Sequence, residues 1–173
     1  AIGLVEFAKK VGADAALTVC PYYNRPDQRG LYAHFEAISK SVELPIFIYN
    51  VPSRTSSDIQ PETVIELSKL PNIIGIKDAT GELGRTTRHF RECKEGFIQL
   101  SGDDPSAIGF NALGGQGCIS VSANVAPKLM ADIQKATLAG DFATAKELEG
   151  KAYKLHRALF RSSSPGPTKY ALS

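Results

Sequence analysis

Lys77 is the residue whose type and position most clearly suggest chemistry. It ends the apolar segment NIIGIK (72–77), which has the composition of a strand buried on both faces. Such surroundings disfavour a charged ammonium group, and a neutral amine attacks carbonyl carbons to form a Schiff base. A second interpretation stays open, in which the ammonium group extends to solvent or pairs with Asp78 or Asp103.

Two further side chains extend this chemistry. Tyr49 ends the apolar segment IFIY, one strand earlier, so its phenol is expected near Lys77, where it would relay protons during imine formation. Arg54 follows five residues later, and its guanidinium group binds carboxylates through two parallel hydrogen bonds. The alternatives are a core tyrosine with a satisfied hydroxyl group and a solvated loop arginine.

The elements that must position these residues alternate regularly along the chain. Apolar segments of strand length are expected at 15–20, 45–50, 72–77, 97–102 and 118–122. Helical periodicity covers 2–12, 31–42, 61–70, 83–94, 104–114, 127–140 and 142–160, and 51–59 and 161–168 are expected to be loops. Alternation with short connections predicts parallel strands and an α/β fold.

Two α/β architectures share this pattern, the open doubly wound sheet and the (β/α) barrel. No strand is followed by G-x-G-x-x-G, the nucleotide-binding motif of the first. The glycine cluster at 114–117 precedes a strand, so a turn is expected there. In both architectures the carboxyl ends of the strands share one edge, so the polar residues after each expected strand can converge into a site. These residues are Tyr22, Tyr23 and Asn24; Tyr49, Asn50 and Arg54; Lys77, Asp78 and Thr80; Ser101, Gly102, Asp103 and Asp104; and Ser120 and Ser122.

Composition excludes several classes of function. The 173 residues carry a net charge of +2 with dispersed Lys and Arg, so no nucleic-acid partner is expected. No apolar run reaches the roughly 20 residues that cross a bilayer, so no membrane association is expected either. The three separated cysteines suit a reducing cytoplasm. Because the three histidines fall in helices away from the strand ends, no metal site is predicted. Asp104 is expected to cap the helix that follows it.

Four motifs of the sequence resemble those of a known family. PYYNRP, YNVPSRT, GIKDATG and LSGDD, in this order, resemble the dihydrodipicolinate synthase family of pyruvate-dependent class I aldolases and lyases, the group that includes N-acetylneuraminate lyase. The resemblance implies a (β/α)8 barrel with a helical C-terminal extension, usually a homotetramer built as a dimer of dimers. It also implies condensation of pyruvate with L-aspartate 4-semialdehyde to 4-hydroxy-tetrahydrodipicolinate, in lysine and diaminopimelate biosynthesis. No cofactor is needed, since the lysine itself is the electron sink.

The resemblance assigns roles to matching positions. Lys77 would form the Schiff base with pyruvate, Tyr49 would be the proton relay, and Arg54 would bind the carboxylate of the semialdehyde. Tyr23 would reach into the site of a neighbouring subunit. Gly102 and Ile119 would line the lysine pocket with their backbone, and Tyr22 matches a position in the lysine feedback site of inhibited members.

The chain departs from the family pattern in its number of strands. Five are expected here against eight in the family, so residues 1–139 would form a partial barrel and residues 140–173 the start of the helical extension. Three βα units are expected before Ala1, in a longer parent chain, and the 173 residues alone are expected to be inactive. Two alternatives remain: a sibling aldolase or dehydratase acting on a sugar acid, and a non-catalytic paralogue or barrel fragment.

Overall fold

The structure is a computed structural model that describes residues 1–173. Its first part alternates helices and strands: α1 (Ile2–Lys10), β1 (Ala16–Val19), α2 (Gln28–Ser41), β2 (Ile46–Asn50), α3 (Pro52–Thr55), α4 (Pro61–Ser68), β3 (Ile73–Asp78), α5 (Leu83–Glu92) and β4 (Ile98–Ser101). The rest is helical: η1 (Asp104–Ser106), α6 (Ala107–Ala112), η2 (Ser122–Asn124), α7 (Pro127–Leu138), α8 (Phe142–Leu159) and α9 (Gly166–Ala171). No helix is both long and apolar enough to cross a membrane.

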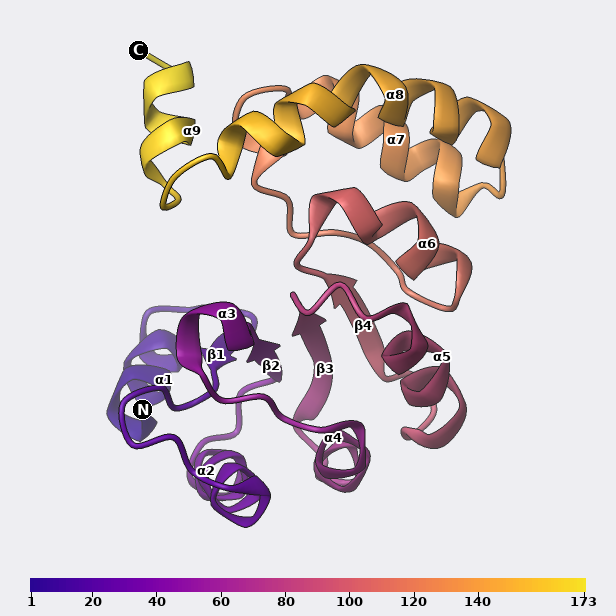
Figure 1. Cartoon of the computed structure of the whole chain (residues 1–173). Helices are drawn as coiled ribbons and strands as arrows, with labels where there is room; N and C mark the ends of the chain where they lie inside the picture. The colour runs from indigo at the N-terminus through magenta and orange to yellow at the C-terminus, as the bar shows by residue number, and fades with distance from the viewer.

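The four strands form one parallel sheet in the order β1-β2-β3-β4 (Figure 1). A doubly wound sheet reverses its strand order at a switch point and carries helices on both faces. Here the order is strictly sequential, and the side chains that pack against the helices alternate along each strand, apart from a register shift near Ile73 in β3. On the other face Leu17 and Val19 are 47% and 36% exposed. This arrangement is the one expected of a barrel wall, with helices outside and an inner face opposite them.

The core lies between the outer face of the sheet and the helices. Ile46, Ile48, Ile73 and Ile76 are fully buried against apolar side chains of α2 and α4 in a cluster of 15 residues. Burial of this many apolar side chains is the main stabilising term of the fold. It also fixes which side chains of β2 and β3 must face the opposite, inner side.

The fifth expected strand, at 118–122, is the main difference from the sequence prediction. Only Cys118 pairs with the sheet, through a parallel bridge to Ser101. The carboxylate of Asp104 accepts hydrogen bonds from the backbone N–H groups of Val121 and Ser122, each at 3.0 Å. These bonds turn the backbone into η2, so a longer ladder cannot form.

Two expected loops contain short helices. Residues 51–59 include α3, which begins at Pro52, and residues 161–168 run into α9. Figure 1 shows α7 and α8 lying side by side beyond the carboxyl ends of the strands, with α9 following them. Met130 and Ile133 of α7 and Ala152 of α8 form a small core of their own.

Candidate active site

Lys77 and Tyr49 lie side by side on the inner face of the sheet. They are register partners in the parallel ladder between β2 and β3, and Lys77 Nζ lies 4.0 Å from the centre of the Tyr49 ring. Their sequence neighbours Asn50 and Asp78 are buried on the opposite face, as strand alternation requires. The ladder therefore holds an amine and a phenol together without any help from a loop.

Close packing requires a glycine at position 75, two residues before Lys77. A Cβ atom at this position would lie 2.4 Å from the backbone oxygen of Ile98 and 2.5 Å from Cε1 of Phe47. A Cβ atom essentially never lies this close to a non-bonded atom, so β3 can pack here only with glycine. The G-x-K pattern thus has a steric cause in the inner face below the lysine.

Neither aspartate proposed as a partner for Lys77 pairs with it. Asp78 points to the outer face, where one carboxylate oxygen accepts bonds from the backbone N–H of Thr80 at 2.8 Å and its hydroxyl group at 2.5 Å. Burial raises the pKa of Asp78, and these bonds offset only part of that effect. Asp103 instead accepts hydrogen bonds from Ser106. Lys77 forms no ion pair, and its Nζ atom lies over the Tyr49 ring.

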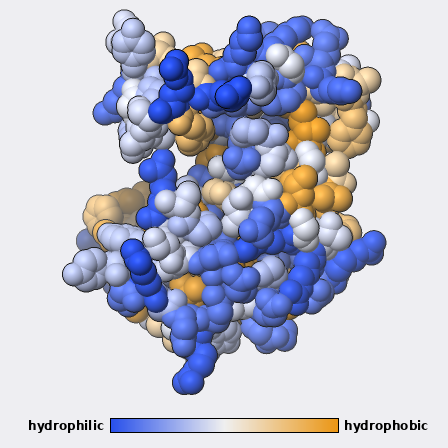
Figure 2. Space-filling model, viewed as in Figure 1, coloured by the Kyte–Doolittle hydropathy of each residue, from blue (hydrophilic) through white to orange (hydrophobic).

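The two residues open into a pocket of about 380 Å³ at the carboxyl ends of the strands. Four predicted site residues line it: Tyr49, Arg54, Lys77 and Gly102. Figure 2 shows an indentation between the part of the surface that carries α3 and the part formed by α8 and α9. Larger hollows of about 850 Å³, 590 Å³ and 430 Å³ lie between α2 and α4, beside β1, and between α1 and the end of α2, but none contains any of these four residues.

Arg54 lies on α3 and lines this pocket. The short helix runs from Pro52 to Thr55, and the next residue, Ser56, ends it with a left-handed φ of 53°. Thr55 closes the turn, since its hydroxyl group bonds the backbone of Val51 and Ser57. Arg54 itself is exposed and has no carboxylate partner within the chain, so its guanidinium group is free to bind an anion.

Gly102 lies against the stem of the lysine. A Cβ atom at this position would lie 3.0 Å from Cε of Lys77 and 2.7 Å from Cβ of Ala79. Its N–H donates to the backbone oxygen of Asp78 at 2.6 Å, which fixes the chain at this distance. Gly102 therefore belongs to the wall of the pocket because nothing larger fits beside Lys77.

Three predicted site residues lie outside the pocket. Tyr23 is 94% exposed, and Tyr22 is 64% exposed beside the separate hollow next to β1. Ile119 is 39% exposed, and its backbone N–H bonds to the oxygen of Ser101. None of the three lines the pocket that holds Lys77 and Tyr49.

Other pocket residues were missed by sequence reasoning. They are Val51, Ser53, Ala79, Val121, Phe160 and the run Ser162–Ser164, which follows α8. The only signal for the last of these was a polar triplet after a long amphipathic helix, and that pattern is typical of any loop. Asp103, which was expected at the rim, also lines the pocket.

The expected role of Asp104 was wrong. The residue that caps the following helical turn is Asp103, whose carboxylate accepts from the N–H of Ser106 at 3.2 Å. Asp104 is buried, and it binds the backbone of Val121 and Ser122 instead. The site as a whole offers an amine, a phenol and a guanidinium group, and no cluster of three or more His, Cys, Asp or Glu could hold a metal ion.

Comparison with known proteins gives a consistent family. The sequence profile of the dihydrodipicolinate synthetase family matches residues 1–173. The 4-hydroxy-tetrahydrodipicolinate synthase of Phenylobacterium zucineum (strain HLK1) is 58% identical over 173 residues, which are 100% of this chain and 59% of that protein. The enzyme of the same name from Hyphomonas neptunium is 58% identical over 175 residues, covering 100% of this chain and 60% of its own length.

Solved structures agree with the sequence relatives. Dihydrodipicolinate synthase from Aquifex aeolicus matches with a TM-score of 0.95 and 42% identity, over 98% of this chain and 58% of that chain. The chloride-inhibited enzyme from Acinetobacter baumannii, complexed with pyruvate, matches with a TM-score of 0.95 and 47% identity, over 99% and 59%. The chain thus spans about three fifths of the length of these proteins. The predicted fold class is confirmed: the sheet and its helices are part of a (β/α)8 barrel.

Proposed function

The chain belongs to the dihydrodipicolinate synthetase family, and on this premise we propose that the protein condenses pyruvate with L-aspartate 4-semialdehyde through a Schiff base on Lys77. The observation that carries the proposal is the distance of 4.0 Å between Lys77 Nζ and the Tyr49 ring, in a pocket that Arg54 also lines. Pyruvate is supported as a substrate by its presence in the related Acinetobacter baumannii complex.

The first half of the reaction makes pyruvate a nucleophile. The neutral amine of Lys77 adds to C2 of pyruvate, and the carbinolamine loses water to give an imine. The phenol of Tyr49 donates the proton that leaves with the hydroxyl group. The phenolate of Tyr49 then takes a proton from C3, which restores the phenol and gives an enamine. The imine nitrogen accepts the electron pair, so that no cofactor is required.

The second half forms the carbon–carbon bond and releases the lysine. The enamine carbon attacks the aldehyde carbon of the semialdehyde, and Tyr49 protonates the alkoxide that results. The amino group of the semialdehyde then attacks C2, displaces Lys77 and closes the ring of 4-hydroxy-tetrahydrodipicolinate. Each proton transfer in this scheme takes place close to the phenol that lies over the amine.

Arg54 supports the synthase over a sibling aldolase or dehydratase that acts on a sugar acid. Its guanidinium group lines the pocket without an internal carboxylate partner, which suits it to the carboxylate of the semialdehyde. A sibling enzyme would use the same imine but would not require this arginine. A non-catalytic role would require neither Arg54 nor Lys77.

The remaining expectations concern the whole protein. We propose that it works in the cytoplasm as a homotetramer and that Tyr23, which is 94% exposed, completes the site of a neighbouring subunit. Tyr22 would contribute to a lysine feedback site, and Ile119 would line the lysine pocket with its backbone. Residues 1–139 would supply part of the barrel, and residues 140–173 the start of the helical extension.

The test compares aldehyde partners in the full-length protein. We expect pyruvate and aspartate semialdehyde to give the cyclic product, and we expect Arg54→Gln to raise the KM for the semialdehyde. Arg29→Gln is the matched control, because Arg29 is exposed in the hollow between α2 and α4, away from the site. Preference for a sugar-acid aldehyde, with Arg54→Gln unaffected, would favour the sibling enzyme. No turnover with any aldehyde would favour the non-catalytic role.

A further inference from the structure

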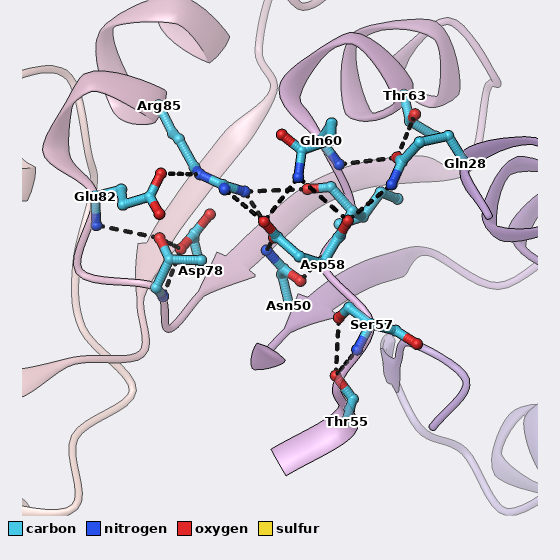
Figure 3. A network of polar contacts seen from close by, with 12 residues as sticks. Gln28, Asn50, Thr55, Ser57, Asp58, Gln60, Thr63, Asp78, Glu82 and Arg85 are labelled. Atoms are coloured by element: carbon cyan, nitrogen blue, oxygen red, sulfur yellow. Dashed lines mark hydrogen bonds and ion pairs between the residues drawn. The ribbon is translucent and has the colours of Figure 1, made fainter. Parts of the chain in front are cut away.

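Asp58 is the centre of a hydrogen-bond network on the outer side of the strand ends (Figure 3). One carboxylate oxygen accepts from Nδ2 of Asn50 at 2.8 Å and from Nη1 of Arg85 at 2.8 Å. The other accepts from Nε2 of Gln60 at 2.7 Å and from Nη2 of Arg85 at 2.6 Å. Burial alone would raise the pKa of Asp58, but hydrogen bonds from Arg85, Asn50 and Gln60 outweigh it, and the pKa lies below its ordinary value.

Arg85, the ion-pair partner of Asp58, is largely buried and makes several hydrogen bonds of its own. Its side chain is only 10% exposed, and it forms a bidentate ion pair with the carboxylate of Asp58. Its Nε donates to Glu82 at 2.8 Å, and Nη1 also reaches the backbone oxygen of Ile59 at 3.2 Å. This geometry differs from that of the exposed pairs elsewhere on the surface, which contribute little to any structure.

The network closes the loop that carries Arg54. Asn50 is fully buried at the end of β2, directly after Tyr49. Its side chain donates to Asp58 and accepts from the backbone N–H of Ile59 at 3.3 Å. The hydrogen bonds of Asn50 with Asp58 and Ile59 therefore hold together the two ends of residues 51–57, which include α3 and Arg54.

Two more elements of the strand-end rim attach to Asp58. Gln28 begins α2, immediately after the loop that carries Tyr23, and its Nε2 donates to the backbone oxygen of Asp58 at 2.8 Å. Oε1 of Gln28 accepts from the backbone of Gln60 and from the hydroxyl group of Thr63. Arg85 lies in the first turns of α5, after β3 and Lys77. Through its carboxylate and its backbone oxygen, Asp58 thus ties three strand-end segments together.

We propose that Asp58 and Arg85 are positioning residues that set Arg54 at its distance from the Lys77–Tyr49 pair. The inference rests on the proposed function, since it assigns Arg54 to the second substrate. The pair itself does not need this support, because the backbone ladder of β2 and β3 holds it in register. Loosening Asp58 should therefore impair binding of the semialdehyde and leave imine formation with pyruvate in place.

The test uses Asp58→Asn in the full-length protein. The asparagine keeps the shape, but its NH2 group faces either the donors of Asn50 and Arg85 or those of Gln60 and Arg85, so one side of the network is lost. We expect the KM for the semialdehyde to rise about tenfold or more, as for a displaced substrate contact. We expect the rate of borohydride trapping with pyruvate to stay within about twofold. Arg85→Lys keeps the charge but cannot donate two parallel hydrogen bonds to Asp58, so it should also raise the KM for the semialdehyde.

The matched control is Arg88→Gln, which breaks the exposed ion pair between α5 and Glu62 of α4. It should leave the KM for the semialdehyde and the rate of borohydride trapping unchanged, at a temperature where circular dichroism shows every variant folded. The inference is overturned if KM in Asp58→Asn and Arg85→Lys matches this control, or if KM and trapping deteriorate together, as a general loss of structure would require. Failure of the unmodified protein to be trapped with pyruvate would instead overturn the proposed function.

Discussion

The substitution Gly102→Ala tests the geometry around Lys77 with a single methyl group. The new Cβ atom would lie 3.0 Å from Cε of Lys77 and 2.7 Å from Cβ of Ala79, whereas ordinary contacts begin at 3.4 Å. The lysine stem must therefore retreat by at least 0.4 Å, the difference between 3.0 Å and 3.4 Å. The backbone of Gly102 cannot yield easily, because its N–H is bonded to Asp78 at 2.6 Å.

The expected cost falls on both catalysis and stability. A displacement of 1 Å at a reacting group costs about a hundredfold in rate, so a shift of about 0.4 Å should lower kcat by several-fold to about tenfold. Overpacking of a tight site should lower the free energy of unfolding by about 1–3 kcal/mol. Steady-state kinetics measure kcat, borohydride trapping with pyruvate measures the rate of imine formation on Lys77, and urea unfolding measures stability.

Gly84→Ala is the control for this experiment. Gly84 lies in α5, and a Cβ atom there would meet nothing within 4 Å. Alanine in a helix is favoured over glycine, so this variant should gain roughly 0.5–1 kcal/mol and keep its activity. If Gly102→Ala retains the kcat and the trapping rate of Gly84→Ala, then Lys77 does not depend on the space at Gly102, and the reasoning is refuted.

Three further predictions concern other parts of the molecule. Tyr49→Phe keeps the ring over Lys77 but removes the phenolic proton, so kcat should fall by about 10²–10⁴-fold with little change in stability; an unchanged kcat in steady-state assays would remove Tyr49 from the mechanism. His89 is buried in α5, and burial lowers its pKa to about 4. Because only the unfolded chain then takes up this proton below about pH 6.5, stability should fall between about pH 7 and pH 4 by about 3 kcal/mol, and His89→Gln should reduce this loss in urea titrations. Finally, residues 1–173 expressed alone should show no synthase activity, since the inner face of the sheet stays open; turnover by this fragment would contradict the need for a closed barrel.

The sequence was sufficient to predict the elements whose signal is local. Apolar periodicity identified four strands and the helices between them, and the position of Tyr49 and Lys77 at the ends of adjacent strands made their proximity foreseeable. The 118–122 segment shows the limit, because its apolar residues favour a strand. Its backbone is turned instead by the carboxylate of Asp104, 17 and 18 residues away from Val121 and Ser122.

The rest of the site depends on contacts between distant segments. Asp58 and Arg85 are 27 residues apart, and neither lies in a pattern that distinguishes it from other charged surface residues. Phe160 and the serines that follow it reach the pocket only because α8 packs back against α7. Such contacts follow from the three-dimensional path of the chain, and periodicity within one segment carries no information about them.

The central claim is that the amine of Lys77 attacks a keto acid. Full-length protein would be incubated with pyruvate and borohydride, digested, and mapped by mass spectrometry, with Lys77→Arg treated in parallel. The account predicts one reduced pyruvate adduct, on Lys77, and none in the arginine variant. An adduct on another lysine, or no adduct in a folded protein that still consumes pyruvate, would contradict it.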